Sequence, residues 1–208
     1  NTLNSVSVFL PTNETDTYMY EVLNGRAPSD ILHLDTSVNV IDPIVRCRRE
    51  DCDDQSKELG AASRVDFQSH WQYRYLFDSD GAGFSGRFLP FMQSHSLPFK
   101  TGLFRQWFDS RITPWLHFVP IDLRLHGLWS TLAYFAGVDT TLTVNGATRH
   151  VHMPPHDIEG TWIAEEGRKW ANRVIRKEDM EIYFFRLLLE WGRITDDQRD
   201  VLGYRLDM

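Results

Sequence analysis

The segment that most constrains the fold of this chain runs from residue 71 to residue 94. It opens with the alternating aromatic stretch WQYRYLF, which is typical of a strand, and continues through the glycine-rich stretch DSDGAGFSGRF (residues 78–88) into the apolar spacing of a helix. A strand that leads into a helix through such a turn is the basic unit of an α/β fold. Ligands of these folds bind beyond the carboxyl ends of the strands, so the turn is the first candidate for a binding site.

Elsewhere the apolar residues alternate between strand spacing and helix spacing. Strands are predicted at residues 31–41, 71–77, 96–100 and 115–121, and helices at residues 53–62, 85–94, 125–137, 161–175 and 180–191. Residues 138–158, which contain Gly, Pro and Thr, are expected to form a loop, and residues 1–30 show no sustained period. We therefore predict an α/β fold over residues 31–208, preceded at residues 1–30 by a peripheral arm or the remnant of another domain.

The composition argues against two classes of function. The formal net charge is −7 and no basic run occurs, so we expect no nucleic-acid partner. No stretch approaches the roughly 18 apolar residues that cross a bilayer, so we predict no transmembrane segment in this chain.

Two short features favour the secretory pathway, in the ER or Golgi lumen. Asn13-Glu14-Thr15 is a glycosylation sequon. Cys47 and Cys52 are the only cysteines, and their polar loop fits either a local disulfide in an oxidising lumen or two free thiols. The chain begins at Asn1 without a methionine, so we expect a piece of a longer protein, which is either free in the lumen or membrane-anchored.

The glycine-rich stretch has the composition of a phosphate-binding turn. Its glycines allow unusual backbone dihedrals and a close approach of a ligand, and the N–H groups that open the following helix attract an anion. Ser85 adds a hydroxyl donor, and Arg87 adds a charge-assisted contact to a phosphate. We interpret the stretch as a diphosphate site, and the alternative is an ordinary tight turn. The candidate binding residues are Gly81, Ala82, Gly83, Phe84, Ser85, Gly86 and Arg87.

Three longer stretches carry a family resemblance. They are YRYLFDSDGAGFSGRFLPFMQSHSLPFK, FRQWFDSRITPWLHFVPID and GRKWANRVIRKEDMEIYFFRLLLEW. In this order they resemble glycosyltransferase family 90, in particular the capsule-associated, CAP-type proteins of fungi, which are related to the animal protein O-glucosyltransferases. The C…DC…Q pattern of Cys47, Cys52 and Gln55 also looks like fungal members, and the resemblance covers roughly residues 30–200.

The resemblance implies a GT-B architecture, in which two Rossmann-like domains face each other across a cleft and the C-terminal one holds most of the donor. It implies an inverting, metal-independent transfer from a UDP-sugar, such as UDP-xylose or UDP-glucose, to a hydroxyl of a glycan or protein, without a cofactor. The family's donor segment corresponds to Gly81–Arg87. Ser85 and Arg87 would contact the donor, and Arg87 would offset the charge that develops on the diphosphate leaving group.

The sequence departs from the family in two ways. The stretch GVDTTLTVNGATRHVHMPPHDIEG (residues 137–160) lengthens what looks like a short loop in relatives. The family's catalytic base is an aspartate of the N-terminal domain, and no carboxylate of this chain corresponds to it, so the catalytic residue is unknown. The alternative function is a truncated, inactive nucleotide-binding or scaffold domain.

Two sets of residues suggest metal binding instead. Asp78 and Asp80 resemble the acidic motif with which another glycosyltransferase class holds a divalent cation against the diphosphate, but turn residues that cap local N–H groups look the same. We favour the turn, because Arg87 already supplies positive charge.

The histidines offer the second possibility. His150, His152 and His156 could ligate zinc, although a surface loop that happens to hold histidines fits better. The remaining histidines of the apolar stretches are expected in or beside the core, and His117 is the one most suited to face a ligand. They are His95, His117 and His126.

Overall fold

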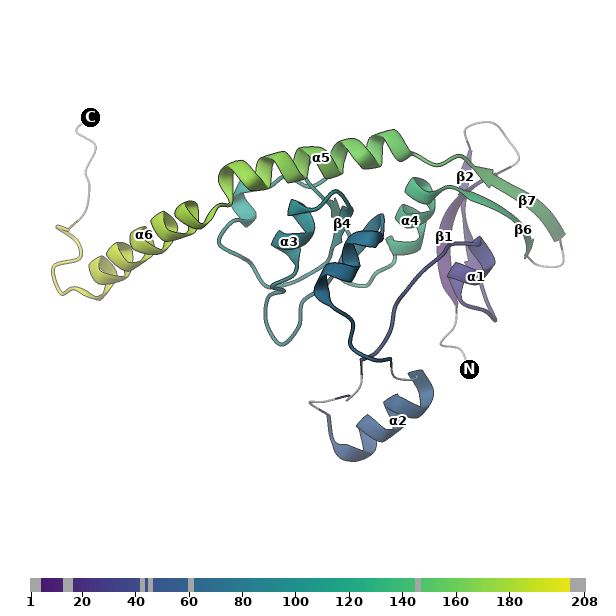
Figure 1. The fold of residues 1–208 in the computed structure, drawn as a ribbon, viewed down its shortest axis with the longest axis horizontal. Coiled ribbons are helices and arrows are strands. Elements are labelled where there is room, and N and C mark those ends of the chain that lie inside the picture. Colours follow the sequence, from purple (N-terminus) through teal and green to yellow (C-terminus); the bar gives the residue numbers. More distant parts are fainter. Residues whose placement is uncertain are drawn as a thin grey trace. The chain divides into compact units, whose positions relative to one another are not determined.

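The computed structural model describes residues 5–12, 17–41, 44, 47–59, 62–144 and 147–202. The chain divides into two compact units, each built from segments that are distant in the sequence (Figure 1). Unit 1 comprises Asn1–Leu76 and Ile121–Thr161, and unit 2 comprises Phe77–Pro120 and Trp162–Met208. The glycine-rich stretch therefore lies in unit 2, and the sequon at Asn13 lies outside the described residues.

Unit 1 is built on two antiparallel hairpins. β1 (Val6–Pro11) pairs with β2 (Tyr18–Leu23), and β6 (Val138–Val144) pairs with β7 (Ala147–Met153). Its helices are α1 (Pro28–Leu32), α2 (Arg49–Leu59) and α4 (Leu128–Ala136), and η2 (Phe67–Gln72) is a 3₁₀ helix. Both hairpins, α1 and α4 contribute to one core, which consists of Val8, Leu10, Leu23, Leu32, Ala133, Val138, Leu142, Val151 and Met153.

Arg149 of β7 fastens the second hairpin to the first. Its Nη2 donates to Oε1 of Glu21 at 2.8 Å, and its Nη1 donates to the carbonyl of Pro11 at 2.7 Å. The two side chains are only 17% and 6% exposed. Removing one partner of a buried ion pair typically costs about 3–5 kcal/mol, so this pair fixes how the hairpins meet.

The second hairpin corrects the loop that we expected at residues 138–158. Val138, Thr140 and Leu142 alternate towards the core, and Val151 and Met153 meet them from β7. The period of two is therefore present, but the inward position of Thr140 is polar and conceals it.

The N-terminal part also differs from expectation. The strand predicted at residues 31–41 does not form: residues 31 and 32 belong to helix α1, which Pro28 starts and His33 ends with φ 55° and ψ 39°, and further on Ile41 forms a single bridge to Ala62. Residues 1–30, for which no period was recognised, instead supply β1 and β2. Cys47 and Cys52 form a disulfide at the start of α2, with their Cα atoms 5.6 Å apart.

The sheet that carries the glycine-rich stretch has the order β3 (Tyr75–Asp78), β4 (Leu97–Lys100) and β5 (Val119–Pro120), and β4 and β5 are parallel. α3 (Phe88–Gln93) connects β3 to β4, as predicted, and η3 (Asp109–Arg111) lies between β4 and β5. β5 is shorter than the predicted strand 115–121, because a turn at Trp115 (φ 66°) precedes it. The prediction of a mixed α/β fold is confirmed.

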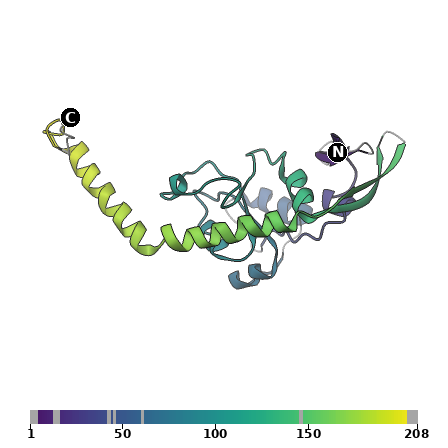
Figure 2. The ribbon, with the colours of Figure 1, turned by 90° about the horizontal axis from the view of Figure 1, so that it is seen from above.

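Two long helices end unit 2. α5 (Asp157–Val174) places Ala171 in a core with Phe88, Met92, Phe108 and Phe118. α6 (Lys177–Thr195) follows after a bend and contains no buried residue (Figure 2). Both helices confirm the prediction, made from the spacing of apolar residues, that these segments are helical. None of the described helices is long and apolar enough to cross a membrane.

Candidate functional site

The last residue of β3, Asp78, organises the glycine-rich stretch. Its carboxylate is fully buried, and Ser85 donates its hydroxyl proton to Oδ1 at 2.5 Å. The same hydroxyl oxygen accepts the backbone N–H of Arg87 at 3.2 Å. Ser85 is itself buried, so its hydroxyl closes the loop from inside. The sequence-based role of Ser85 as a phosphate donor would require that this bond break.

Two cations compensate the buried charge of Asp78. The Nε of Arg87 lies 3.6 Å from Oδ1, and the Nζ of Lys100 lies 3.8 Å from Oδ2 and 4.1 Å from the centre of the Phe88 ring. Burial raises the pKa of the Asp78 carboxyl above its ordinary value of 3.8, while the Ser85 hydroxyl and the charges of Lys100 and Arg87 oppose that rise. The charge of nearby Asp80 also raises that pKa, so two carboxylates face two cations here and the cluster has no net formal charge.

Asp80 fastens the loop to the segment that follows β4. Its Oδ2 accepts the backbone N–H groups of Leu103 at 2.5 Å and Phe104 at 3.0 Å. A Cβ at Gly102 would lie 2.7 Å from Oδ1 of Asp80, so this contact requires glycine. The turn interpretation expected both aspartates to cap local N–H groups, whereas Asp78 accepts the Ser85 hydroxyl and Asp80 accepts N–H groups of the next loop.

The three glycines of the loop act through open space rather than through unusual dihedrals. Among the described residues, glycines with positive φ are confined to Gly25 and Gly137. A Cβ placed on Gly81, Gly83 or Gly86 would meet no atom within 4 Å. The loop therefore does not use the unusual dihedrals that its glycines allow, and space lies open above all three of them.

The loop turns several of its candidate residues outward. Phe84 is 62% exposed and the Arg87 side chain 51% exposed, and Gly81, Ala82 and Gly86 are exposed beside them. α3 behind the loop has only six residues, so its dipole is weaker than that of a full helix. The guanidinium of Arg87 is therefore the principal outward positive group of the loop.

The histidines are occupied elsewhere. His150 and His152 both contact the carboxylate of Asp139, at 2.8 and 3.3 Å, and the hydrogen bonds from His150 and then His152 lower the pKa of Asp139. His156 stacks on Tyr134 with ring centres 3.6 Å apart. No group of three potential metal-ligating side chains occurs in the described part of the chain.

Of the other histidines, only His117 is buried as expected. Its Nδ1 accepts the backbone N–H of Thr113 at 2.9 Å, its ring stacks on Trp170, and burial lowers its pKa. His95 and His126 are exposed, because both lie in turns rather than within an apolar element, and His95 pairs with Glu165.

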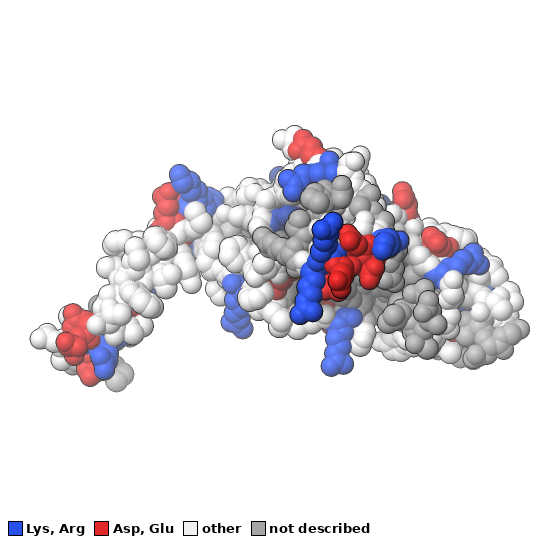
Figure 3. Space-filling model, turned by 90° about the horizontal axis from the view of Figure 1, so that it is seen from below, with Lys and Arg blue, Asp and Glu red and all other residues white. Residues whose placement is uncertain are grey.

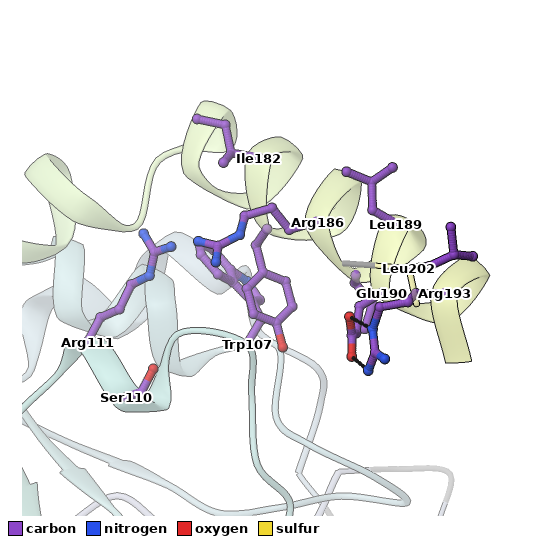
Figure 4. A pocket seen from close by; sticks show the side chains of 11 residues that line it. Trp107, Ser110, Arg111, Ile182, Arg186, Leu189, Glu190, Arg193 and Leu202 are labelled. Carbon is purple, nitrogen blue, oxygen red and sulfur yellow. Dashed lines mark hydrogen bonds and ion pairs between the residues drawn. The ribbon is translucent and has the colours of Figure 1, made fainter. Parts of the chain in front are cut away.

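A cavity of about 970 Å³ beside α6 is a second possible ligand site (Figure 4). It is lined by Trp107, Ser110, Arg111, Ile182, Tyr183, Arg186, Leu187, Leu189, Glu190, Arg193 and Leu202. Arg193 is bound to Glu190 at 2.8 and 2.5 Å, and Arg111 donates to the carbonyl of Val174 at 3.0 Å. These guanidinium groups already have partners, which makes the cavity the weaker candidate.

Figure 3 shows the charged side chains on one face of the molecule. On the face drawn in Figure 3, acidic and basic side chains lie next to one another. Such mixing creates no broad field of one sign on this face.

Sequence reasoning missed Lys100 and the cross-loop contact of Asp80. Lys100 is a lysine at the carboxyl end of an otherwise apolar strand, and Asp78 occupies the same place on the preceding strand. Neighbouring strand ends with opposite charges were a usable signal, since buried charges are normally paired. Nothing local marks Leu103 and Phe104 as partners of Asp80.

Comparison with known proteins agrees with the motifs. The chain is similar to the "O-glucosyltransferase rumi homolog" of Aedes aegypti, with 27% identity over 137 residues, which cover 64% of this chain and 30% of that protein. It is similar to human "Protein O-glucosyltransferase 1", with 25% identity over 134 residues, which cover 64% of this chain and 30% of that protein. It is also similar to human "Protein O-glucosyltransferase 3", with 23% identity over 149 residues, which cover 71% of this chain and 26% of that protein. The chain thus spans about 30% of the length of the first of these relatives.

The match to the family itself is broader. The family model described as "Glycosyl transferase family 90" matches residues 30–200, a range that contains the glycine-rich loop, Asp78 and Lys100. The chain therefore belongs to glycosyl transferase family 90.

Proposed function

We propose that this chain is the donor-binding domain of a UDP-sugar-dependent glycosyltransferase. The observation that carries the proposal is the loop 81–87, which combines open space above its glycines with the exposed guanidinium of Arg87 at the end of β3. A diphosphate needs close backbone approach and a cationic partner, and the loop offers both. The family membership directs the choice of phosphate ligand towards a nucleotide-sugar.

The proposed architecture is a Rossmann-like domain over residues 31–208 that serves as the C-terminal domain of a GT-B enzyme. The parallel pairing of β4 and β5 supports it, as does the strand–loop–helix unit formed by β3 and α3. A ligand at the loop would occupy the carboxyl ends of the strands, where α/β folds bind ligands.

The proposed reaction is an inverting, metal-independent transfer. An acceptor hydroxyl forms a bond to the anomeric carbon, the bond from that carbon to the UDP oxygen breaks, and the hydroxyl proton passes to a base. Arg87 would stabilise the negative charge that grows on the departing UDP. Asp78 would orient Arg87 and Ser85, and the base is an aspartate expected in the acceptor-binding domain of the enzyme.

The donor and location are proposed on indirect grounds. The names of the relatives refer to O-glucosyl transfer, which favours UDP-glucose over UDP-xylose and a hydroxyl of a protein or glycan as acceptor. The Cys47–Cys52 disulfide favours an oxidising compartment such as the ER or Golgi lumen, with the protein either free or membrane-anchored there.

Calorimetric titration with UDP tests the proposal. Arg87→Ala should weaken UDP binding about tenfold or more, because a charge-assisted contact contributes about 1.5–3 kcal/mol. Gly83→Val should also weaken binding, since its side chain would fill space that is open in the free protein. Arg124→Ala is the matched control, because it removes an exposed arginine of unit 1. A wild-type chain that binds no UDP would refute the donor site.

Turnover separates the enzyme from the alternative of an inactive nucleotide-binding or scaffold domain. UDP release from UDP-glucose in the presence of acceptor glycans and peptides would support the enzyme. UDP binding without release would support the alternative. A UDP affinity that collapses in excess chelator would contradict the metal-independent reaction.

A further inference from the structure

Unit 2 exposes large apolar side chains on two neighbouring loops. Phe84 is 62% exposed on the loop after β3, and Leu103 and Phe104 are 74% and 51% exposed on the loop after β4. The two strands are neighbours in the sheet, and the backbone N–H of Thr101 donates to the carbonyl of Asp78 at 3.0 Å. Both loops therefore start from the same edge of the sheet.

Asp80 holds the second loop by the backbone of its exposed residues. Its Oδ2 accepts N–H groups from Leu103 and Phe104 at 2.5 and 3.0 Å, and Gly102 leaves room for the carboxylate. We call this arrangement of Asp80, Gly102, Leu103 and Phe104 the Asp80 clasp. It fixes the backbone of the loop that presents Leu103 and Phe104 to solvent.

The position of the clasp suggests what it receives. Asp80 lies between Asp78, which pairs with Arg87 and Lys100, and Gly81, which opens the proposed diphosphate loop. In a nucleotide whose diphosphate lies on that loop, the ribose carries the base away from the phosphates, within reach of a neighbouring loop. Aromatic side chains commonly receive bases by stacking, and each stack contributes a large part of the affinity.

We propose that the Asp80 clasp and Phe84 form the wall that receives the base of the donor nucleotide. This inference rests on the proposed donor site, and it assigns separate parts of the nucleotide to separate residues. Arg87 and the glycines bind the diphosphate, Phe104 and Phe84 contact the base, and Asp80 is a positioning residue that acts through the backbone of residues 103 and 104.

The test compares UDP with inorganic pyrophosphate by calorimetry. Phe104→Ala should lower the affinity for UDP about tenfold and leave the affinity for pyrophosphate unchanged. Asp80→Ala and Gly102→Ala should produce the same selective loss, since one removes the carboxylate and the other displaces it. Asp80→Asn retains an acceptor oxygen and should recover part of the loss. Leu123→Ala is the matched control, because it removes an exposed leucine of unit 1.

The outcomes separate the two proposals. If the wild-type chain binds neither UDP nor pyrophosphate, the proposed function itself fails. If it binds both and Phe104→Ala weakens neither, or weakens both equally, the clasp does not receive the base although the diphosphate site stands. A Phe104→Ala chain that loses affinity for UDP-glucose but not for UDP would assign the wall to the sugar and overturn the inference. Phe104→Ala and Gly102→Ala keep the test valid should Asp80→Ala fail to fold.

Discussion

α5 and α6 are consecutive helices of similar length that differ in burial. α5 has 18 residues and α6 has 19. Ile163, Ala164 and Ala171 of α5 are at most 6% exposed, whereas no residue of α6 is buried. Phe184 and Trp191 of α6 are 57% and 66% exposed. Both sequences nevertheless show the apolar spacing of an amphipathic helix.

The difference lies in the size of the apolar residues. The packed face of α5 includes Ala164, Gly167 and Ala171, and small residues allow the helix backbone to approach its neighbours. The apolar positions of α6 carry large side chains that are mostly exposed, and Tyr183 packs against Trp107 with ring centres 5.7 Å apart. Spacing therefore predicts that a segment is helical, while residue size indicates how closely it packs. Each helix contains at least one Gly, Ile, Trp and Glu, so paired substitutions can test the contrast.

The largest difference is expected for the glycines. A Cβ on Gly167 would lie 2.2 Å from the carbonyl oxygen of His117, and a backbone atom cannot move aside easily. Gly167→Ala should lower the free energy of unfolding by about 3 kcal/mol or more. A Cβ on Gly192 of α6 meets nothing within 4 Å, so Gly192→Ala should raise it by about 0.5–1 kcal/mol. Urea denaturation measures both values, and a Gly167→Ala chain as stable as wild type would contradict this close approach of α5.

The isoleucines should differ next. Ile163 of α5 is 6% exposed, and its truncation to Ala leaves a cavity that typically costs about 2–3 kcal/mol. Ile182 of α6 is 57% exposed, so Ile182→Ala should change the free energy of unfolding by about 0.5 kcal/mol or less. Equal losses in the two variants, measured in the same urea titration, would show that α6 is packed in solution.

The secondary structure near the site was largely predictable from the sequence. The strand that ends at Asp78, the turn that follows and helix α3 all have strong local patterns. The hairpin of β6 and β7 was missed, because its threonines and histidines resemble loop residues although they alternate correctly. The buried pair of Arg149 and Glu21, 128 residues apart, could not be found from either local sequence.

The candidate site was likewise predictable from the sequence only in part. The sequence identified the outward Arg87 and the open glycines, since residue type and spacing suffice for those. It could not show that Ser85 turns inward, because that direction depends on the burial of Asp78 and on Lys100 from another strand. Side-chain direction is set by tertiary contacts, and a single sequence does not contain those.

The tryptophans should show a smaller contrast than the isoleucines. Trp170 of α5 donates its indole N–H to the carbonyl of Arg111 at 2.6 Å and stacks on His117. Trp170→Phe keeps most of the ring contact but leaves that carbonyl without its donor, which should cost about 1–2 kcal/mol. Trp191 of α6 is 66% exposed, so Trp191→Phe should leave the free energy of unfolding unchanged within error. A loss in the second variant as large as in the first would contradict the exposed position of Trp191.

Replacing the glutamates should change the free energy of unfolding least, and this change should depend on pH. The hydrogen bond from Arg168 and then that from His95 lower the pKa of Glu165 on α5 below its ordinary value of 4.5. Because the folded chain holds the ionised form more strongly than the unfolded chain does, this stability is fully present above pH 4.5 and is lost as the pH falls through the lower folded pKa. Glu165→Gln should therefore reduce the free energy of unfolding at pH 7 by less than about 1 kcal/mol, as for other surface pairs.

The same argument sets the control on α6. The hydrogen bond from Arg193 lowers the pKa of Glu190, but the Glu190 side chain is 51% exposed, compared with 28% for Glu165. Solvent weakens an exposed pair more, and Glu190 lacks a counterpart to His95, so Glu190→Gln should have the smaller effect at pH 7. Urea titrations of both variants between pH 3 and pH 7 provide the measurement. A Glu165→Gln loss that persists unchanged at pH 3 would mean that ionisation is not its cause, and the difference between the helices would then rest on packing alone.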